Sequence, residues 1–367
     1  MTMRFSLPVA VAVAIGGALA TAPSGWAKGD PEPAAAMSAP LATQGAIEQD
    51  RQRCRTMNGS HQALIASCSA VIAWRDASPR ELAVAYAHRG DIRQLDNDVA
   101  NAMEDLDEAI RIDPDFATPY VTRGILWARG GNPDRAIVDY NRAIALEPSM
   151  MLAYYNRGHA WRRKGDSEAA IADFSRAIAL GPEVALLRGV RGDAYFARHD
   201  YARAIADYDE QIRLAPKDAE AYFNRGCAYR DSKHYPRALA DFARMIELAP
   251  QDARSWRSRG FVRLLTQDFR GSVSDYDQAL RLDPGSVTAH YNRGSALAML
   301  GRKKEALADY DRAIQLDPAY PLNYVGRGDL LRETGDRKGA LVMYRKALAL
   351  AADFPPALEG MKKLGAR

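Results

Sequence analysis

Apolar residues recur at helical spacing along most of the chain. One stretch places the following residues on a single helical face: Ala136, Ile137, Tyr140, Ala143 and Ile144. Pro148 ends this stretch, because proline donates no backbone hydrogen bond and crowds the residue before it. The pattern predicts a helix that packs its apolar face against a partner helix and the next element.

The same pattern returns every 34 residues. An Arg-Gly dipeptide keeps this interval, with its glycine at Gly90, Gly124, Gly158, Gly192, Gly226, Gly260, Gly294 and Gly328. Prolines keep the same step at Pro114, Pro148, Pro182, Pro216, Pro250, Pro284 and Pro318. These markers predict eight contiguous helical hairpins, which we number as repeats one (83–116) to eight (321–354).

Repeat three, residues 151–184, resembles the tetratricopeptide repeat (TPR) family. It carries the family's series of large, small and aromatic residues at Tyr154, Gly158, Trp161, Ala170, Phe174, Ala177 and Pro182. The resemblance extends over all eight repeats. It implies an all-α fold, a right-handed TPR superhelix (α-solenoid), whose first helices line the concave face.

Each Arg-Gly glycine is expected where the second helix of the repeat crosses the first at close range. The matching small residue is Ala102, Ala136, Ala170, Ala204, Ala238, Ala306 or Ala340, and Ser272 replaces it in repeat six. Elsewhere Arg188 and His290 replace the usual aromatic. Gln211 and Met245 replace an alanine, so we expect altered curvature in repeats four to six.

The array has distinct ends. Residues 45–82 resemble a degenerate helical pair, with Cys54 and Cys68 on either side of a turn at residues 58–60. We expect a Cys54–Cys68 disulfide, although two buried thiols in a reducing compartment are the alternative. At the other end, residues 355–367 predict a capping helix with Leu358, Met361 and Leu364 on one side.

The N-terminus has the features of an export signal. Arg4 precedes a short apolar stretch from Leu7 to Ala22, and small residues follow. We predict a signal peptide at residues 1–27, with cleavage after Ala20 or an uncleaved anchor as alternatives. A disordered, Pro/Ala-rich linker is predicted at 28–44. The protein is then exported, to the periplasm in first place, with secretion or a signal anchor as the other destinations.

Charge along the chain is nearly balanced. Fifty Lys and Arg residues face 46 Asp and Glu residues, and the net +4 is spread out rather than gathered in one stripe. This argues against nucleic acid as a partner. The arginines before the glycines (Arg157, Arg191, Arg225, Arg259, Arg293) and the second-helix aspartates (Asp139, Asp173, Asp207, Asp241, Asp275, Asp309) recur with the period, and we expect a polar ladder between neighbouring repeats.

The sequence contains no recognisable metal-binding or catalytic motif. The six histidines include no i, i+4 pair with an intervening Glu, and there is no Cys-x-x-Cys, phosphate loop or Gly-x-Ser-x-Gly elbow. Too few residues precede the array for a separate catalytic domain. We therefore expect no enzyme activity, no metal site and no cofactor.

Function is expected where the repeats differ on their first helices. By the family resemblance, the second, fifth, sixth, ninth, twelfth and thirteenth residues of each repeat line a groove. The candidate peptide-binding residues are Leu152, Tyr155, Asn156, His159, Arg163, Phe223, Asn224, Arg254, Arg257, Phe261, Tyr291 and Asn292. Asparagine can bond both groups of a peptide backbone, and aromatic residues offer pockets for its side chains.

Two functions fit these features. The first is a non-catalytic protein interaction scaffold that binds an extended segment of a protein or peptide partner. The alternative is a cell-envelope assembly subunit that self-associates or binds envelope glycan.

Overall fold

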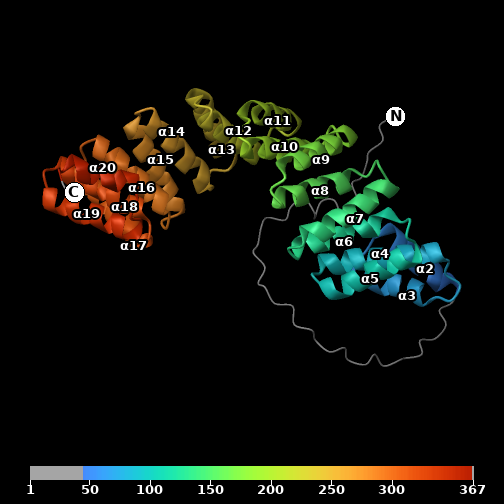
Figure 1. Ribbon diagram of the computed structural model, residues 1–367. Coiled ribbons are helices and arrows are strands. Elements are labelled where there is room, and N and C mark those ends of the chain that lie inside the picture. The colour runs from blue at the N-terminus through green and yellow to red at the C-terminus, as the bar shows by residue number, and fades with distance from the viewer. Residues whose placement is uncertain (1–43, 366–367) are drawn as a thin grey trace. The chain divides into compact units, whose positions relative to one another are not determined.

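The computed structural model describes residues 44–365, and all regular structure in this range is helical. Figure 1 shows the helices as antiparallel pairs placed side by side. The predicted signal peptide and most of the predicted linker lie outside the described residues. Between residues 44 and 365, no helix has the length and apolar character needed to span a membrane.

The chain divides into two compact units, Met1–Leu187 and Arg188–Arg367, and the division falls inside one helix, α10. The first helices of the repeats are α4 (Pro79–Leu95), α6 (Ala117–Arg129), α8 (Met151–Arg163), α10 (Ala185–Ala197), α12 (Ala219–Asp231), α14 (Ala253–Leu265), α16 (Val287–Met299) and α18 (Pro321–Glu333).

The second helices of the repeats are α5 (Val99–Ile112), α7 (Pro133–Leu146), α9 (Ser167–Leu180), α11 (Tyr201–Leu214), α13 (Tyr235–Leu248), α15 (Phe269–Leu282), α17 (Lys303–Leu316) and α19 (Arg337–Leu350). The predicted hairpins are therefore present at the predicted period. One boundary differs, because α4 begins four residues before repeat one. Ser78 and Glu81 form a capping box there, which satisfies backbone groups at the helix start.

A left-handed residue separates the two helices of every repeat. This fifteenth position has a positive φ in all eight repeats, at Asn97, Gly131, Gly165, His199, Lys233, Gln267, Gly301 and Gly335. An acidic or amide N-cap then starts several second helices, as where Asp166 accepts from the Ala169 backbone N–H at 3.0 Å. The turn and the cap together fix where the chain reverses.

The Arg-Gly glycine makes room for an aromatic ring. A Cβ added to Gly158 would lie 2.6 Å from Cε1 of Phe174, and one added to Gly124 would lie 2.5 Å from Cε1 of Tyr140. We expected the glycine to contact mainly the alanine of the second helix, and this expectation is wrong, because its main contact is the aromatic ring. The alanine is fully buried beside the ring, but the ring lies one helical turn further on and reaches back across the crossing.

The arginine before each glycine forms a clamp inside its own repeat. Arg157 donates from Nε and Nη2 to the two carboxylate oxygens of Asp173, at 2.8 and 2.7 Å. Its Nη1 donates to Asn141 Oδ1 of the preceding repeat, at 2.6 Å. The same bidentate pairing joins Arg123 to Asp139, Arg191 to Asp207, Arg225 to Asp241, Arg259 to Asp275 and Arg293 to Asp309.

The predicted ladder between repeats is therefore corrected. The recurring aspartates bind within the hairpin, because they lie 16 residues after the arginine on the facing helix. The link to the preceding repeat uses a different residue, two positions after that repeat's own aspartate. Asp107, Asn141, Asp209, Asp277 and Asp311 fill this role.

The fourth residue of a repeat ties its first helix to the preceding loop. Tyr120 donates to the Pro114 carbonyl at 3.1 Å, and Trp256 donates to the Pro250 carbonyl at 3.0 Å. His290, which replaces the aromatic in repeat seven, still lies 3.3 Å from the Pro284 carbonyl. The contact of the fourth residue with the loop is therefore kept in repeat seven although histidine replaces the larger residue.

The replacement at Gln211 has a local compensation. Gly189 faces it, and a Cβ on that glycine would lie 2.6 Å from Gln211 Oε1. The amide nitrogen of Gln211 donates to Asp218 Oδ2 at 2.8 Å. The larger side chain therefore fills space that Gly189 leaves open, and altered curvature in repeats four to six stays a prediction.

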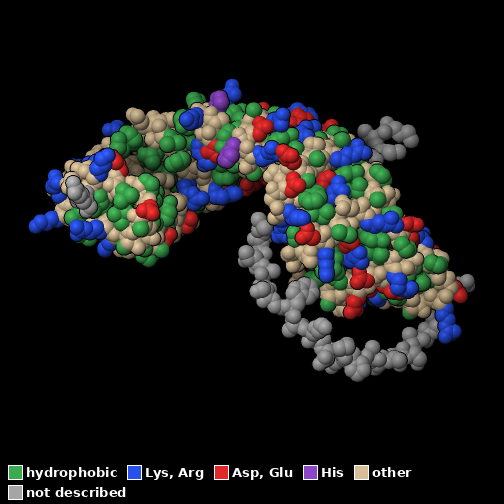
Figure 2. All heavy atoms as spheres, in the orientation of Figure 1, with side chains coloured by type: hydrophobic (Ala, Val, Ile, Leu, Met, Phe, Trp, Pro, Cys, Tyr) green, Lys and Arg blue, Asp and Glu red, His purple; other side chains and the backbone are tan. Residues whose placement is uncertain are grey.

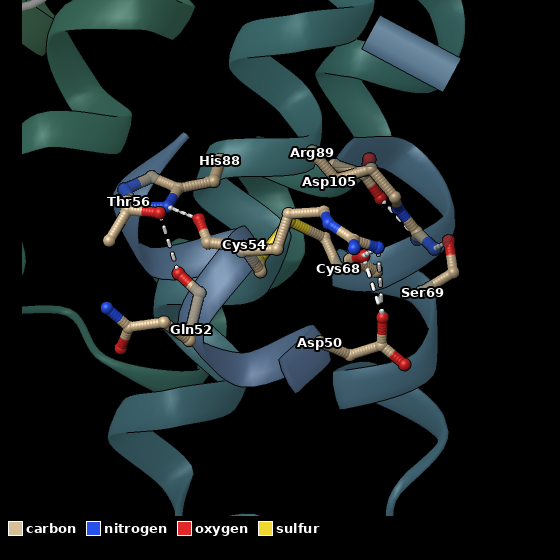
Figure 3. Close-up of a disulfide and its surroundings, with 11 residues drawn as sticks. Asp50, Gln52, Cys54, Thr56, Cys68, Ser69, His88, Arg89 and Asp105 are labelled. Carbon is tan, nitrogen blue, oxygen red and sulfur yellow. Dashed lines mark hydrogen bonds and ion pairs between the residues drawn. A yellow bond between two sulfur atoms is a disulfide. The ribbon is translucent and has the colours of Figure 1, made fainter. Parts of the chain in front are cut away.

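The first helical pair is closed by the expected disulfide. Helices α2 (Gln44–Thr56) and α3 (His61–Ala73) are joined through Cys54 and Cys68, which are 3% and 0% exposed. Figure 3 shows how this pair contacts repeat one: His88 Nδ1 lies 2.8 Å from the Cys54 carbonyl, and Arg89 joins Ser69 to Asp105. The disulfide prediction is confirmed.

The last helix, α20 (Pro355–Lys363), packs on α18 and α19 as a cap. Met361 and Leu364 are buried, but Leu358 is 46% exposed, so its predicted place on the buried side is wrong. Ala357, Gly360 and Met361 define the buried face. Leu358 points about a quarter of a turn away from that face, at 100° per residue.

We predict that the disulfide stabilises the N-terminal hairpin by about 3 kcal/mol, the value expected for a closed loop of this size. Reduction should therefore accelerate amide hydrogen exchange in α2 and α3. In a Cys227→Ser background, reduction produces thiols only at Cys54 and Cys68. Helices α18 and α19 provide the internal control, and equal protection of α2 with and without reductant would contradict the prediction.

We also predict graded costs for alanine at the Arg-Gly glycines. Gly158→Ala should lower the free energy of unfolding by about 1–3 kcal/mol, because its Cβ forces the Phe174 ring to move. Gly260→Ala is the matched variant and should cost less, since its nearest neighbour, Asp275 Cβ, lies 3.2 Å away. Urea unfolding measures both, and equal costs would mean that ring contact does not set the helix separation.

Candidate functional site

First helices form the more closely spaced layer in each unit. Pairs such as α4 and α6 in the N-terminal unit, or α14 and α16 in the C-terminal unit, contact each other directly. Second helices instead make their main contacts with the first helices on either side. In a curved stack of hairpins, the layer whose helices lie closer together is the inner, concave layer. We call the exposed surface of the first helices in each unit the groove face.

In the N-terminal unit, the candidate residues lie on α8 and are partly built into the core. Tyr155 is 6% exposed, and its ring centroid lies 6.3 Å from that of Phe174. Asn156 donates to the Leu152 carbonyl of its own helix at 2.9 Å, and Leu152 is half-buried. Tyr155 therefore contributes mainly to packing, and the Asn156 amide nitrogen is used within its own helix.

His159 lies edge-on between two rings, 4.6 Å from the Tyr155 centroid and 5.1 Å from that of Phe174. Its Nε2 is buried without a hydrogen-bond partner among the described residues. Burial, followed by the positive charges of Arg162 and Arg163, lowers the pKa of His159 to about 3. The ring is therefore neutral at physiological pH. Arg163 itself is exposed and donates to the Ala128 carbonyl.

In the C-terminal unit, Arg254 is neutralised by the protein itself. It forms ion pairs with Glu220 and with Asp252, the latter at 2.6 Å, and its guanidinium carbon lies 5.0 Å from the ring centroid of Phe223. Asn224 donates to Asp193 Oδ1 at 3.3 Å. These contacts occupy two of the groups that a partner's carboxylate would need in repeats four to six.

Repeats six and seven are different. Arg257 makes a long hydrogen bond, 3.4 Å from Nη1 to Ser286 Oγ, and no carboxylate of residues 44–365 lies within ion-pair distance of it. Phe261 and Asn292 are half-buried. The ring centroid of Tyr291 lies 5.7 Å from that of Tyr310, in space that Gly326 leaves open.

Two groove-face residues were missed from the sequence. Leu265 and Met299, the thirteenth residues of repeats six and seven, are 45% and 64% exposed. Repeats two, three, five and eight carry a charged residue at this position: Arg129, Arg163, Asp231 and Glu333. Comparison of this one position across repeats would have found the exposed apolar pair.

The surface charge is mixed. Figure 2 shows basic and acidic side chains interspersed over the helices of both units, without a stripe of one sign on the face drawn. Within residues 44–365, no cluster of three or more His, Cys, Asp and Glu side chains could hold a metal ion. The described part of the groove face offers apolar contact and hydrogen bonding.

We predict that His159 makes the fold sensitive to acid. Its pKa is lower in the folded chain than the usual 6.5, so the unfolded chain binds the proton first, and stability falls as the pH drops from about 6.5 toward 3. At pH 5 the loss should reach about 2 kcal/mol. Urea unfolding of wild type and His159→Leu at pH 7.5 and pH 5 isolates the effect, and identical losses in both proteins would contradict it.

Solved structures resemble the fold at low sequence identity. A tetratricopeptide repeat protein from Parabacteroides merdae superimposes with a TM-score of 0.54 and 18% identity, over 68% of this chain and 98% of that one. The Cut9 and Hcn1 hetero-tetramer of the APC/C gives 0.52 and 14%, over 88% and 63%. PilF of Pseudomonas aeruginosa gives 0.50 and 20%, over 57% and 96%. These likenesses concern the fold alone.

No curated protein matches the sequence. Three family models described as tetratricopeptide repeat do match it, at residues 122–185 and 264–321, at 192–254 and 228–290, and at 83–116. Together they cover more than half of the chain. The chain therefore belongs to the tetratricopeptide repeat family.

Proposed function

We propose that this protein interaction scaffold captures an extended segment of a partner protein along its groove face. The observation that carries the proposal is the exposed apolar pair Leu265 and Met299, on first helices of adjacent repeats, where four other repeats carry a charged residue. Exposed apolar side chains on neighbouring repeats supply contact area for a partner's side chains.

Polar groups beside this pair support an extended ligand. Asn292 lies on α16, the helix that carries Met299. Its amide can bond both the N–H and the C=O of a strand-like segment, whose own hydrogen bonds are otherwise unmade. Alternating apolar and polar contacts along the first helices therefore match the two kinds of group that an extended peptide presents.

The disulfide supports a location outside the reducing cytoplasm. Cys54 and Cys68 are bonded and buried, and disulfides of this kind persist in oxidising compartments. Together with the export signal expected at residues 1–27, this favours an exported scaffold that meets its partner in the periplasm or beyond.

We predict that the groove face, not the outer face, carries binding. The double variant Leu265→Ser with Met299→Ser should weaken the affinity for peptides selected on the wild type at least tenfold, which is about 1.4 kcal/mol. That loss is smaller than full burial of one such side chain contributes. Isothermal titration of the full-length chain measures it.

The matched control is Val138→Ser with Val342→Ser. These valines are 66% and 48% exposed on the second helices α7 and α19, so the change in surface chemistry is similar but lies on the outer layer. Equal weakening by both double variants would refute groove binding. If no peptide binds and sedimentation velocity shows concentration-dependent association instead, the alternative of a self-associating envelope subunit replaces the proposal.

A further inference from the structure

One hydrogen bond links the core to the groove face in several repeats. The aromatic residue at position 24 of the repeat, on the second helix, points toward the ninth residue of the repeat, on the first helix. Tyr208 donates to Asp193 Oδ1 at 2.8 Å, and Tyr344 donates to Asp329 Oδ1 at 2.8 Å. In repeat seven, the Tyr310 hydroxyl lies 3.2 Å from Ser295 Oγ. The ninth residue thus supplies the acceptor for a buried hydroxyl.

Repeat six breaks this arrangement. Its position 24 is Tyr276, which is 0% exposed, but its ninth residue is Phe261, which has no acceptor. Within residues 44–365 the buried Tyr276 hydroxyl makes no well-formed hydrogen bond, although the Asn292 side chain lies close enough to interact with it. A buried donor without an acceptor is costly and uncommon in native proteins, so it marks a place where something outside the fold completes the bonding.

Other donors surround this position. Arg257, one turn before Phe261, has only the 3.4 Å contact with Ser286 Oγ, and Asn292 of the next repeat lies near the Tyr276 hydroxyl. Asp252 lies close enough for its charge to act on Arg257, but its oxygens are bonded to Arg254 at 2.6 to 3.1 Å. The Tyr276 hydroxyl, the Arg257 guanidinium and the Asn292 amide, which can both donate and accept, therefore converge at a place where no carboxylate of residues 44–365 pairs with Arg257.

The contrast with other repeats identifies the missing chemistry. In repeats four and eight the protein's own carboxylates, Asp193 and Asp329, stand at the ninth position. Repeat six keeps the tyrosine, has Arg257 where repeats four and eight have Gly189 and Val325, and lacks the carboxylate. Leu265, one turn after Phe261, and Met299 on the adjacent helix add exposed apolar surface beside the same place. The local surface is therefore complementary to an anion that has an apolar neighbour.

We propose that repeats six and seven bind an aspartate or glutamate side chain within the partner's extended segment, flanked by a large apolar residue. The carboxylate is received by Arg257 and Asn292 above the Tyr276 hydroxyl, and the apolar residue packs against Leu265 and Met299. This inference rests on the proposed function, since it names what the groove face selects. A planar guanidinium favours a carboxylate through two parallel hydrogen bonds.

The test is selection from a random heptapeptide library with acetylated N-termini and amidated C-termini, on the immobilised full-length chain. Wild type should enrich peptides that carry Asp or Glu within two residues of Leu, Ile, Phe or Met at least tenfold over the input. Arg257→Gln should reduce that acidic enrichment below twofold while apolar residues stay enriched. Phe261→Asp should do the same without removing a donor, because it places a carboxylate where repeats four and eight have one.

Arg270→Gln is the matched control. It removes the same charge from the exposed second helix of the same repeat and should leave the acidic preference intact, and circular dichroism verifies that all variants fold. Peptides recovered without acidic preference, or with one that survives Arg257→Gln, would overturn the inference and leave groove binding in place. Recovery at the bead background from every variant would overturn both proposals.

A second library with free carboxyl termini separates the two sources of a carboxylate. If acidic preference is absent from the capped library and binding requires a free terminus, the site recognises chain ends, and the assignment to an internal acidic side chain is wrong.

Discussion

The crossing of the two helices in each repeat depends on two neighbouring contacts, an ion pair and a glycine–ring contact, between one dipeptide of the first helix and one of the second. In repeat three, Arg157-Gly158 of the first helix meets Asp173-Phe174 of the second. The glycine admits the ring and so sets how close the helices come, while the bidentate ion pair fixes their rotation. Because the aspartate is buried, the arginine must stay in place to compensate its charge. The third guanidinium nitrogen then reaches the preceding repeat, so one residue aligns both the hairpin and the stack.

The 34-residue period, the helical hairpins and the disulfide could be predicted from the sequence, because each depends on residues that lie close together in the chain. The side chains that contact each other where the two helices of a repeat cross could not be predicted. Periodicity shows that Gly158 and Ala170 recur together, but every position of a repeat recurs with the same interval, so the partner of the glycine cannot be chosen by recurrence. The ring of Phe174 is the partner because its side chain points back toward the helix start.

The candidate site shows the same limit. The sequence named Arg254 and Asn224 as binding residues, yet both are bonded to carboxylates of the protein. It also named Arg257, which pairs with no carboxylate of residues 44–365. The identity of the residue alone does not distinguish Arg257 from Arg254. Leu265 and Met299 could have been found by comparing one position across repeats. The unpaired Tyr276 hydroxyl could not, because its significance depends on knowing that the hydroxyl of its counterpart Tyr208 reaches the ninth residue.

The two ends of the array differ in how they can open. A repeat stack has contacts only between neighbours, so its terminal elements lose the least when they detach. At the start, the bond between Cys54 and Cys68 keeps α2 attached to α3 even when its side chains separate, and α2 remains a tethered neighbour that rebinds at once. At the other end, α20 has nine residues and no covalent tie, with Leu358 already in solvent. Of these two capping elements, α20 is therefore the one that detaches from its neighbours at the lower cost.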